Sequence, residues 1–193
     1  MHKTGQGFQL DYHFFDTPLG HILIGASPEG ICLLHFLGLS DSPSEASRGI
    51  LTQTFPEATV TKCQRNPLLR EVERAVLKYF HDHHPLAAFP LDLHTGTSFQ
   101  HQVWKTLCTI PFGETRSYLQ IALALDKPRS CRAVGQACGK NPIPILIPCH
   151  RVISADRRLG GFSGGLHIKK ALLGVEQAPG FSEQNSQRLD LNP

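Results

Sequence analysis

The first third of the chain alternates short apolar runs with turn signals. Residues 8–38 contain three runs of β-forming residues, separated by "TPLG" at 17–20 and "SPEG" at 27–30. This pattern predicts an antiparallel meander. Apolar side chains then recur at helical spacing through residues 68–79, which predicts an amphipathic helix. The proline-rich stretch 83–97 predicts extended structure that links this half to the next.

From Ser98 onward the apolar pattern becomes helical. A first helix is expected with Ser98 as its N-cap and one apolar stripe, formed by Phe99, Val103, Trp104 and Leu107. Residues 111–127 predict a turn and a short helix, and residues 128–140 predict a second short helix. Two short helices with a tight connection resemble a helix-turn-helix, which places its second helix in a groove of DNA.

The second short helix, "CRAVGQACG", consists mainly of small residues, and Arg132 is its only charge. It fits two interpretations equally well: a tightly packed core helix, or a face kept small so that the backbone can press into a groove. Glycine pairs at 160–161 and 164–165 then predict a flexible loop before a last amphipathic helix. Their spacing matches neither a P-loop nor a dinucleotide fingerprint. The chain is therefore expected to be an α+β protein.

Composition narrows the class of protein. The 193 residues are 40% hydrophobic and 18% charged, which is typical of a soluble globular protein. No apolar stretch approaches the roughly 18–20 residues that span a bilayer, and no hydrophobic signal core opens the chain. Six scattered cysteines without a CxxC pair argue against a disulfide framework and against a zinc site. The cluster "HDHH" at 81–84 is expected to be a solvated helix end or loop rather than a metal site.

Charge is distributed unevenly along the chain. Residues 1–96 hold 7 Lys and Arg against 10 Asp and Glu, a net charge of −3, whereas residues 97–180 hold 11 against 4, a net charge of +7. An acidic half followed by a basic half is expected when one domain meets a polyanion. Chance clustering is the alternative.

The chemistry of the chain is concentrated in "PIPILIPCHR", which ends in a thiol, an imidazole and a guanidinium. Cys149 can be a buried structural cysteine, a metal ligand or a reactive thiolate, and a thiolate needs a nearby base or positive charge. Neighbours on an extended chain point to opposite sides, so His150 needs a turn or a bridging water to reach the thiol. Glu176 is the only carboxylate after Asp156 in the basic half that can orient the imidazole. From these residues alone, a structural cysteine and a relay remain equally open.

The motifs of the second half resemble one known family. "IPFGETRSYLQIA", "RAVGQACGKNP", "PCHRV" and "SGGL" occur in the order and spacing of the O6-alkylguanine-DNA alkyltransferases, over roughly residues 98–177. Residues 8–96 resemble the less distinctive N-terminal domain of that family, an RNase H-like sheet with a flanking helix. The resemblance implies an RNase H-like domain over 1–92 and a mostly helical alkyl-transfer domain over 93–180. The tail at 181–193 is polar and lacks periodicity, so it is expected to be disordered.

The resemblance also implies a role for each residue around the thiol. Cys149 accepts the alkyl group, His150 deprotonates it through a water, and Glu176 holds the imidazole. Asn141 braces the turn before the active-site strand, and Tyr118 contacts guanine N3, where its hydroxyl can supply a proton. The thioether has no easy hydrolytic route, so each molecule acts once. Neither a cofactor nor a metal is implied; the zinc ligands of some relatives have no matching set here.

DNA handling follows from the same resemblance. The alkyl group lies inside the base stack, so the nucleotide must be rotated out, and Arg132 enters the gap through the minor groove. The implied DNA contacts are Arg132, Ser117, Tyr118, Ala133 and Gly135. The implied base pocket consists of Tyr118, Cys149, Val152 and Ser163. In that pocket the amide of Ser163 reaches O6, and the carbonyls of Cys149 and Val152 face the exocyclic amine.

The expected partner is double-stranded DNA that carries O-alkylated bases, O6-alkylguanine before O4-alkylthymine. A monomer in the cytoplasm is expected, away from membranes and able to bind DNA cooperatively; a eukaryotic source would move it to the nucleus. The alternative function is a non-catalytic, lesion-binding or regulatory helix-turn-helix protein. Cys149 and Glu176 argue against that alternative, because a protein that only binds DNA needs neither.

Overall fold

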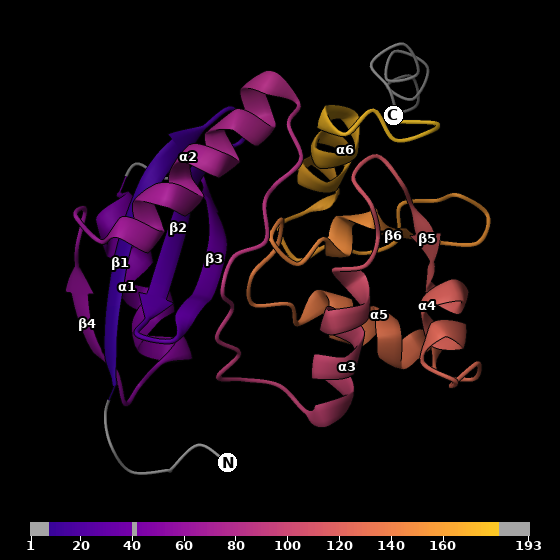
Figure 1. Ribbon diagram of the computed structural model, residues 1–193, viewed down its shortest axis with the longest axis horizontal. Coiled ribbons are helices and arrows are strands. Elements are labelled where there is room, and N and C mark those ends of the chain that lie inside the picture. The colour runs from indigo at the N-terminus through magenta and orange to yellow at the C-terminus, as the bar shows by residue number, and fades with distance from the viewer. Residues whose placement is uncertain (1–7, 40–41, 182–193) are drawn as a thin grey trace. The chain divides into compact units, whose positions relative to one another are not determined.

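The computed structural model describes residues 8–39 and 42–181 (Figure 1). The chain divides into two compact units. The N-terminal unit contains residues up to Asp82 and the segment Leu86–His94, and the C-terminal unit contains His83–Pro85 and the residues from Thr95. Residues 182–193, which are all but the first residue of the predicted disordered tail, lie outside the described residues. Every helix in the described ranges is too short or too polar to cross a membrane.

The N-terminal unit is built on a four-stranded sheet with the strand order β3-β2-β1-β4. Its first three strands form the predicted antiparallel meander: β1 (Gln9–Thr17), β2 (Gly20–Ser27) and β3 (Gly30–Gly38). Gly20 has a φ of 96°, and a Cβ at this position would meet the carbonyl oxygen of Gly38 at 2.5 Å. Only glycine fits this conformation and this close approach, so the first turn signal fixes the register of the hairpin.

One helix packs on each face of this sheet (Figure 1). α1 (Pro43–Thr54) closes a core cluster that contains Leu10, Leu23, Cys32, Leu33, Leu51 and Phe55. α2 (Pro67–Asp82) covers the other face with Leu69, Val72, Val76 and Tyr79, all fully buried. Each such side chain contributes roughly 1.5–3 kcal/mol by leaving water. α2 confirms the predicted amphipathic helix, whereas α1 and the parallel edge strand β4 (Thr59–Lys62) were not predicted.

The proline-rich link continues the sheet at its far edge. Ile31 donates to Pro90 and accepts from Asp92 through the main chain, at 2.9 and 2.8 Å, so residues 90–92 lie beside β3. The "HDHH" residues occupy the end of α2 and the first positions of the link, as expected for a helix end. In the ranges 8–39 and 42–181, no group of three or more His, Cys, Asp or Glu side chains is arranged to hold a metal ion.

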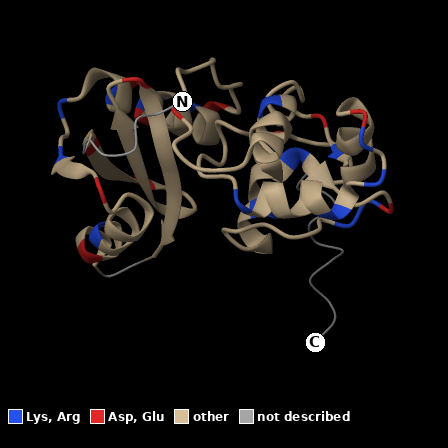
Figure 2. Ribbon diagram, turned by 90° about the horizontal axis from the view of Figure 1, so that it is seen from below, with Lys and Arg blue, Asp and Glu red and all other residues tan. Residues whose placement is uncertain are grey.

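The C-terminal unit is mostly helical. α3 (Ser98–Leu107) is followed by the predicted pair of short helices, α4 (Tyr118–Ala124) and α5 (Cys131–Gly139), which pack together as a helix-turn-helix. The buried Trp104 indole of α3 donates to the Ala137 carbonyl of α5 at 2.8 Å. The chain ends its described part with α6 (Leu166–Val175). Lys and Arg are spread over the helices and loops of this unit (Figure 2).

One detail of α3 differs from the prediction. Thr97, rather than Ser98, is the N-cap, because Thr97 has extended backbone angles while Ser98 is already helical. Thr97 accepts from the main chain of Gln100, and the Gln100 side chain accepts from the Thr97 N–H, at 3.3 and 2.7 Å. This capping box pairs two N–H groups that the first turn leaves free.

Candidate active site

A braced turn delivers Cys149 to the interior of the C-terminal unit. After α5, the Asn141 amide donates to the Ile147 carbonyl at 2.8 Å and to the Cys149 sulfur at 3.1 Å, while its oxygen accepts from Ile143 N–H at 3.0 Å. Ile145 has a φ of 70°, a costly conformation for a β-branched residue. Asn141 therefore holds a strained loop and the thiol at once.

The thiol of Cys149 is almost completely buried, with 2% of the residue exposed. Burial raises its pKa to about 11, although the Asn141 hydrogen bond and the nearby Lys169 charge act in the opposite direction. The resting group is therefore a neutral thiol, and it needs a base before it can attack.

His150 is the candidate base that shares a turn with this thiol. Cys149, His150 and Arg151 form a single 3-10 turn, η1, so neighbouring side chains do not alternate as they would on an extended strand. The His150 Nε2 lies 2.8 Å from Oε1 of Glu176, and both side chains are fully buried. Burial lowers the pKa of His150 and favours neutral imidazole, whose Nε2–H donates to the carboxylate. Its Nδ1 then keeps a lone pair, and no described residue hydrogen-bonds to it.

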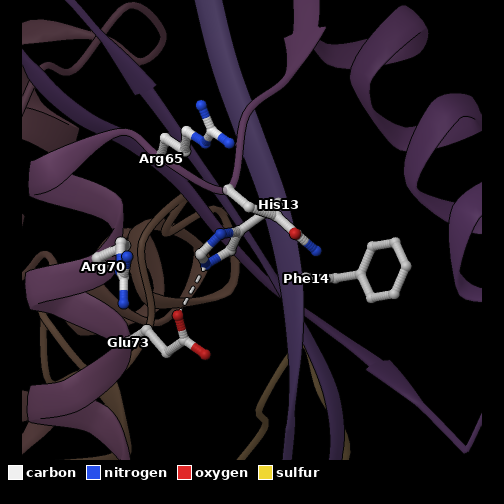
Figure 3. A pocket seen from close by; sticks show the side chains of 6 residues that line it. His13, Phe14, Arg65, Arg70 and Glu73 are labelled. Atoms are coloured by element: carbon white, nitrogen blue, oxygen red, sulfur yellow. Dashed lines mark ion pairs between the residues drawn. The ribbon is translucent and has the colours of Figure 1, made fainter.

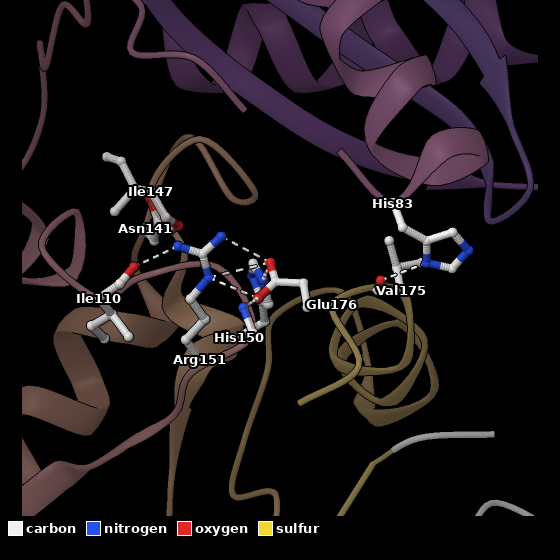
Figure 4. A network of polar contacts seen from close by, with 9 residues as sticks. His83, Ile110, Asn141, Ile147, His150, Arg151, Val175 and Glu176 are labelled. Atoms are coloured by element: carbon white, nitrogen blue, oxygen red, sulfur yellow. Dashed lines mark hydrogen bonds and ion pairs between the residues drawn. The ribbon is translucent and has the colours of Figure 1, made fainter. Parts of the chain in front are cut away.

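Arg151 clamps the carboxylate that orients His150 (Figure 4). Its Nε donates to both oxygens of Glu176, at 3.2 and 2.9 Å, and its Nη2 donates to Oε1 at 2.9 Å. Its Nη1 donates to the Ile110 carbonyl at 2.6 Å, and the Gly113 N–H donates to Oε2 at 3.2 Å. Burial alone would raise the pKa of Glu176, but the His150 and Arg151 interactions lower it to about 2. Glu176 is thus a permanently ionised carboxylate in a fixed orientation.

Lys169 is a second buried cation at the site. Its ammonium donates to the carbonyls of Val152, at 2.6 Å, of Leu159, and of Gly161, at 3.4 Å. These bonds tie α6 to the short strand β6 (Val152–Ile153) and to the glycine loop that follows it. Burial lowers the pKa of Lys169 to about 8, and its positive charge lies close enough to Cys149 to lower the pKa of the thiol.

Tyr118 links the helix-turn-helix to the glycine loop. It opens α4, whose N-cap Ser117 forms a capping box with Gln120. A Cβ on Gly160 would meet the Tyr118 hydroxyl at 2.6 Å, and one on Gly135 would meet the ring at 3.6 Å. Gly160 therefore leaves room for this ring, whereas a Cβ on Gly135 would make only an ordinary contact with it. Burial raises the pKa of Tyr118 to about 12, so its hydroxyl stays protonated.

α5 combines the two interpretations that the sequence left open. Val134, Ala137 and Cys138 are buried against the unit, as in a packed core helix. Arg132 is exposed, and Ala133 and Gly135 are partly exposed. The helix thus has a core face and an outer face of small residues that carries one guanidinium.

The remaining expected residues lie around this cluster. Ser163 is exposed in the loop before α6, and Val152 is buried. The carbonyls of Cys149 and Val152 each already accept one bond, from the Val152 N–H and from Lys169 respectively. Each carbonyl therefore keeps a second lone pair that can accept a further hydrogen bond. The Ser117 hydroxyl accepts from the Gln120 N–H at 3.1 Å, and its own proton remains free to donate.

Two residues of the site were not assigned a role from the sequence. Arg151 was noted beside the thiol, but its partner Glu176 lies 25 residues away, so only tertiary structure reveals the clamp. Lys169 carried a readable signal: it shares the helical stripe of Ile168, Leu172 and Leu173, where an apolar residue would be expected. A lysine at such a position is fully buried only when it has partners.

Comparisons with known proteins identify relatives of the chain. A family model described as "6-O-methylguanine DNA methyltransferase, DNA binding domain" matches residues 98–178. The chain is 40% identical to a methylated-DNA–protein-cysteine methyltransferase of Methanosarcina barkeri, over 86% of this chain and 96% of the relative. Its structure is similar to that of Mycobacterium tuberculosis OGT in complex with DNA, with a TM-score of 0.70, 34% identity, and coverage of 90% and 96%. An O6-methylguanine-DNA methyltransferase of Pyrococcus kodakaraensis is similar at a TM-score of 0.64 and 25% identity, covering 86% and 98%.

Proposed function

The chain belongs to the methylated-DNA–protein-cysteine methyltransferase family, and from this premise we propose that it repairs DNA by direct reversal. It moves the alkyl group of O6-alkylguanine, and less readily that of O4-alkylthymine, irreversibly onto its own Cys149. The observation that carries this proposal is a buried thiol in one turn with an imidazole whose Nε2 is held by an ionised carboxylate. A protein that only binds lesions has no need of that arrangement.

The transfer step requires only side chains of the site, a water molecule and the alkylated base. His150 takes the thiol proton through a water at Nδ1, while Glu176 stabilises the positive imidazole that forms. The Cys149 sulfur forms a bond to the alkyl carbon, and the bond from that carbon to O6 breaks. The departing guanine takes a proton at N3 from Tyr118, and the imidazolium proton later restores the tyrosine through solvent. Because its pKa is about 12, Tyr118 gives up its proton only as negative charge develops on guanine.

DNA recognition falls to the helix-turn-helix. The outer face of α5 enters the minor groove, where its small residues allow close backbone approach and Arg132 occupies the place of the rotated nucleotide. Ser117, Ala133 and Gly135 contact the DNA backbone around it. The glycine loop with Ser163 then closes over the extrahelical base.

The domains, the oligomeric state and the location of the chain complete the proposal. Residues 1–92 form an RNase H-like domain and residues 93–180 form the domain that binds DNA and accepts the alkyl group. The protein acts as a monomer on double-stranded DNA, in the cytoplasm of a bacterial-type cell or in the nucleus of a eukaryotic one. Successive molecules are able to bind cooperatively along the duplex.

Mass spectrometry tests the function directly. The protein is mixed with a duplex that contains O6-methylguanine, and its peptides are then analysed. One stable methyl adduct on Cys149 is expected. Cys149→Ser should gain no adduct, whereas Cys138→Ser, which changes the buried cysteine of α5, should be methylated like the parent. A protein that binds the duplex and gains no methyl group would leave only the role of a lesion binder.

A further inference from the structure

The N-terminal unit contains a polar hollow outside the site of alkyl transfer. It has a volume of about 410 Å³ and is lined by His13, Phe14, Gln64, Arg65, Arg70 and Glu73 (Figure 3). β4 stops at Lys62, and the Cys63 N–H makes the last main-chain hydrogen bond to β1, at the Tyr12 carbonyl. The chain then turns away to begin α2. The hollow is therefore the space between the open edge of β1, the β4–α2 connection and the first turns of α2.

Positive charge gathers at this hollow although its unit is acidic. Residues 1–96 carry only 7 Lys and Arg against 10 Asp and Glu. Two of the 7, Arg65 and Arg70, line the hollow. The Lys62 ammonium lies 4.5 Å from the centre of the Phe14 ring, outside the lining. Neither guanidinium forms an ion pair with any residue in the part of the chain that the structure describes. Two arginines thus line the hollow with a single carboxylate, Glu73.

A buried histidine faces the same space. His13 is 3% exposed, on the sheet face that α2 covers, and its Nε2 lies 3.4 Å from Oε2 of Glu73. That nitrogen has no hydrogen-bond partner among the described residues. Burial lowers the pKa of His13, Glu73 raises it, and Arg70 and Lys62 lower it further. A buried polar atom without a hydrogen bond is costly, and it is satisfied when a ligand supplies the missing partner.

We propose that this hollow binds a phosphate group. Arginine is the side chain best suited to phosphate, because its planar fork donates two parallel hydrogen bonds to a pair of anionic oxygens. Arg65 approaches the group from the β4–α2 connection, Arg70 from the helix, and His13 donates from the sheet. The phosphate belongs either to a DNA backbone or to a free phosphate compound, and the site is independent of the transfer reaction at Cys149.

Nuclear magnetic resonance tests the site with inorganic phosphate as the probe. The full chain is titrated at constant ionic strength, balanced with chloride, while the Arg65 and Arg70 Nε–H signals and the His13 ring are followed. A saturable change at these three residues is expected, together with a rise in the pKa of His13, because a bound anion favours imidazolium. The double variant Arg65→Gln/Arg70→Gln should lose the saturable response. Arg74→Gln, which makes the same change on an exposed position of α2 outside the hollow, should keep it.

A second measurement identifies the source of the phosphate. Binding of undamaged duplex is measured over a range of salt concentrations in the parent and the double variant. If the hollow holds a backbone phosphate, the slope of log K against log salt should fall by about one. An unchanged slope with a saturable phosphate response assigns the site to a free phosphate compound. A phosphate response that never saturates, or that equals the response to added chloride, overturns the proposal. Alkyl transfer to Cys149 from free O6-benzylguanine, which needs no DNA binding, should match the parent in both variants, so failure of this site is distinct from failure of the repair function.

Discussion

The clamp of Arg151 on Glu176 allows a quantitative prediction about stability. Glu176 has a pKa of about 2 instead of its usual 4.5, because His150 and Arg151 outweigh the cost of burial. A difference of about 2.5 units corresponds to roughly 3 kcal/mol of stability at neutral pH. Removing one partner of a buried ion pair generally lowers the free energy of unfolding by about 3–5 kcal/mol. We therefore expect Arg151→Met to lower the free energy of unfolding of the C-terminal unit by about 3 kcal/mol.

The pH dependence of this loss has a definite sign. A carboxyl whose pKa is lowered by folding stabilises the protein above its unfolded pKa, and this contribution disappears as the pH falls through the folded value. The difference between the parent and Arg151→Met should therefore be full above pH 4.5 and shrink toward pH 2. Arg151→Lys should recover only part of it, because a single ammonium cannot reproduce the fork of three bonds to Glu176.

Trp104 provides the assay. It is the only tryptophan of the chain and is buried in the C-terminal unit, so its fluorescence during urea unfolding reports on the unit that holds the clamp. Arg158→Met is the control, because that arginine pairs with Asp156 at an exposed position and its loss should leave the unfolding curve nearly unchanged. If Arg151→Met unfolds at the same urea concentration as the parent at neutral pH, or if the difference is equal at every pH, the clamp does not stabilise the site.

Four further substitutions test the proposed roles in transfer. Cys149→Ser should bind alkylated duplex and transfer nothing; transfer at even a tenth of the parent rate contradicts its role as acceptor. Glu176→Gln should keep the fold and slow transfer by about 10²–10⁴-fold in single-turnover kinetics, the range for a misoriented general base, and an unaltered rate removes it from the relay. Lys169→Met should raise the pKa of the Cys149 thiol further and slow transfer; an unchanged thiol titration would show that its charge does not reach the sulfur. Arg132→Ala should slow transfer from duplex by orders of magnitude while reaction with free O6-benzylguanine stays near the parent rate, since the free base needs no flipping. Equal losses on both substrates exclude the finger role.

Local patterns sufficed for the elements with a strong signal. The meander was predictable because β1–β3 combine apolar runs with turns that require glycine, as at Gly20. α1 was missed because its buried side includes only Ser47 and Leu51, which is too few for a readable stripe. All four residues of β4 are exposed, so no hydrophobic pattern marks this edge strand. The N-cap of α3 was readable from the sequence, because Thr97 and Gln100 have the spacing of a capping box and Ser98 does not fit it.

The site was predictable as a set of residues and less so as a structure. The motifs pointed to Cys149, His150, Asn141 and Glu176. The fold pairs Asn141 with Cys149 and His150 with Glu176 by hydrogen bonds, and it places Cys149 and His150 in one turn. How His150 could lie near the thiol was open from the sequence, since the answer is a 3-10 turn that follows three prolines. The clamp of Arg151 depends on contacts between η1 and α6, which no local pattern encodes. Long-range ion pairs of this kind are set by tertiary packing rather than by sequence spacing.

The high pKa of the acceptor suits a protein that acts once. With a pKa of about 11, Cys149 is thiolate in only on the order of 10⁻⁴ of molecules at pH 7. Thiolates are the form that oxidants attack, so a resting thiol keeps the single acceptor intact until DNA arrives. In the resting state His150 is neutral and is oriented by the ionised Glu176, so it can accept the thiol proton but has not yet removed it. Reactivity then depends on the bound alkylguanine. This nucleobase places the alkyl carbon next to the sulfur, and it accepts negative charge as the bond between that carbon and O6 breaks. An enzyme that turned over many times would gain from a lower thiol pKa, whereas this chain gains from a protected one.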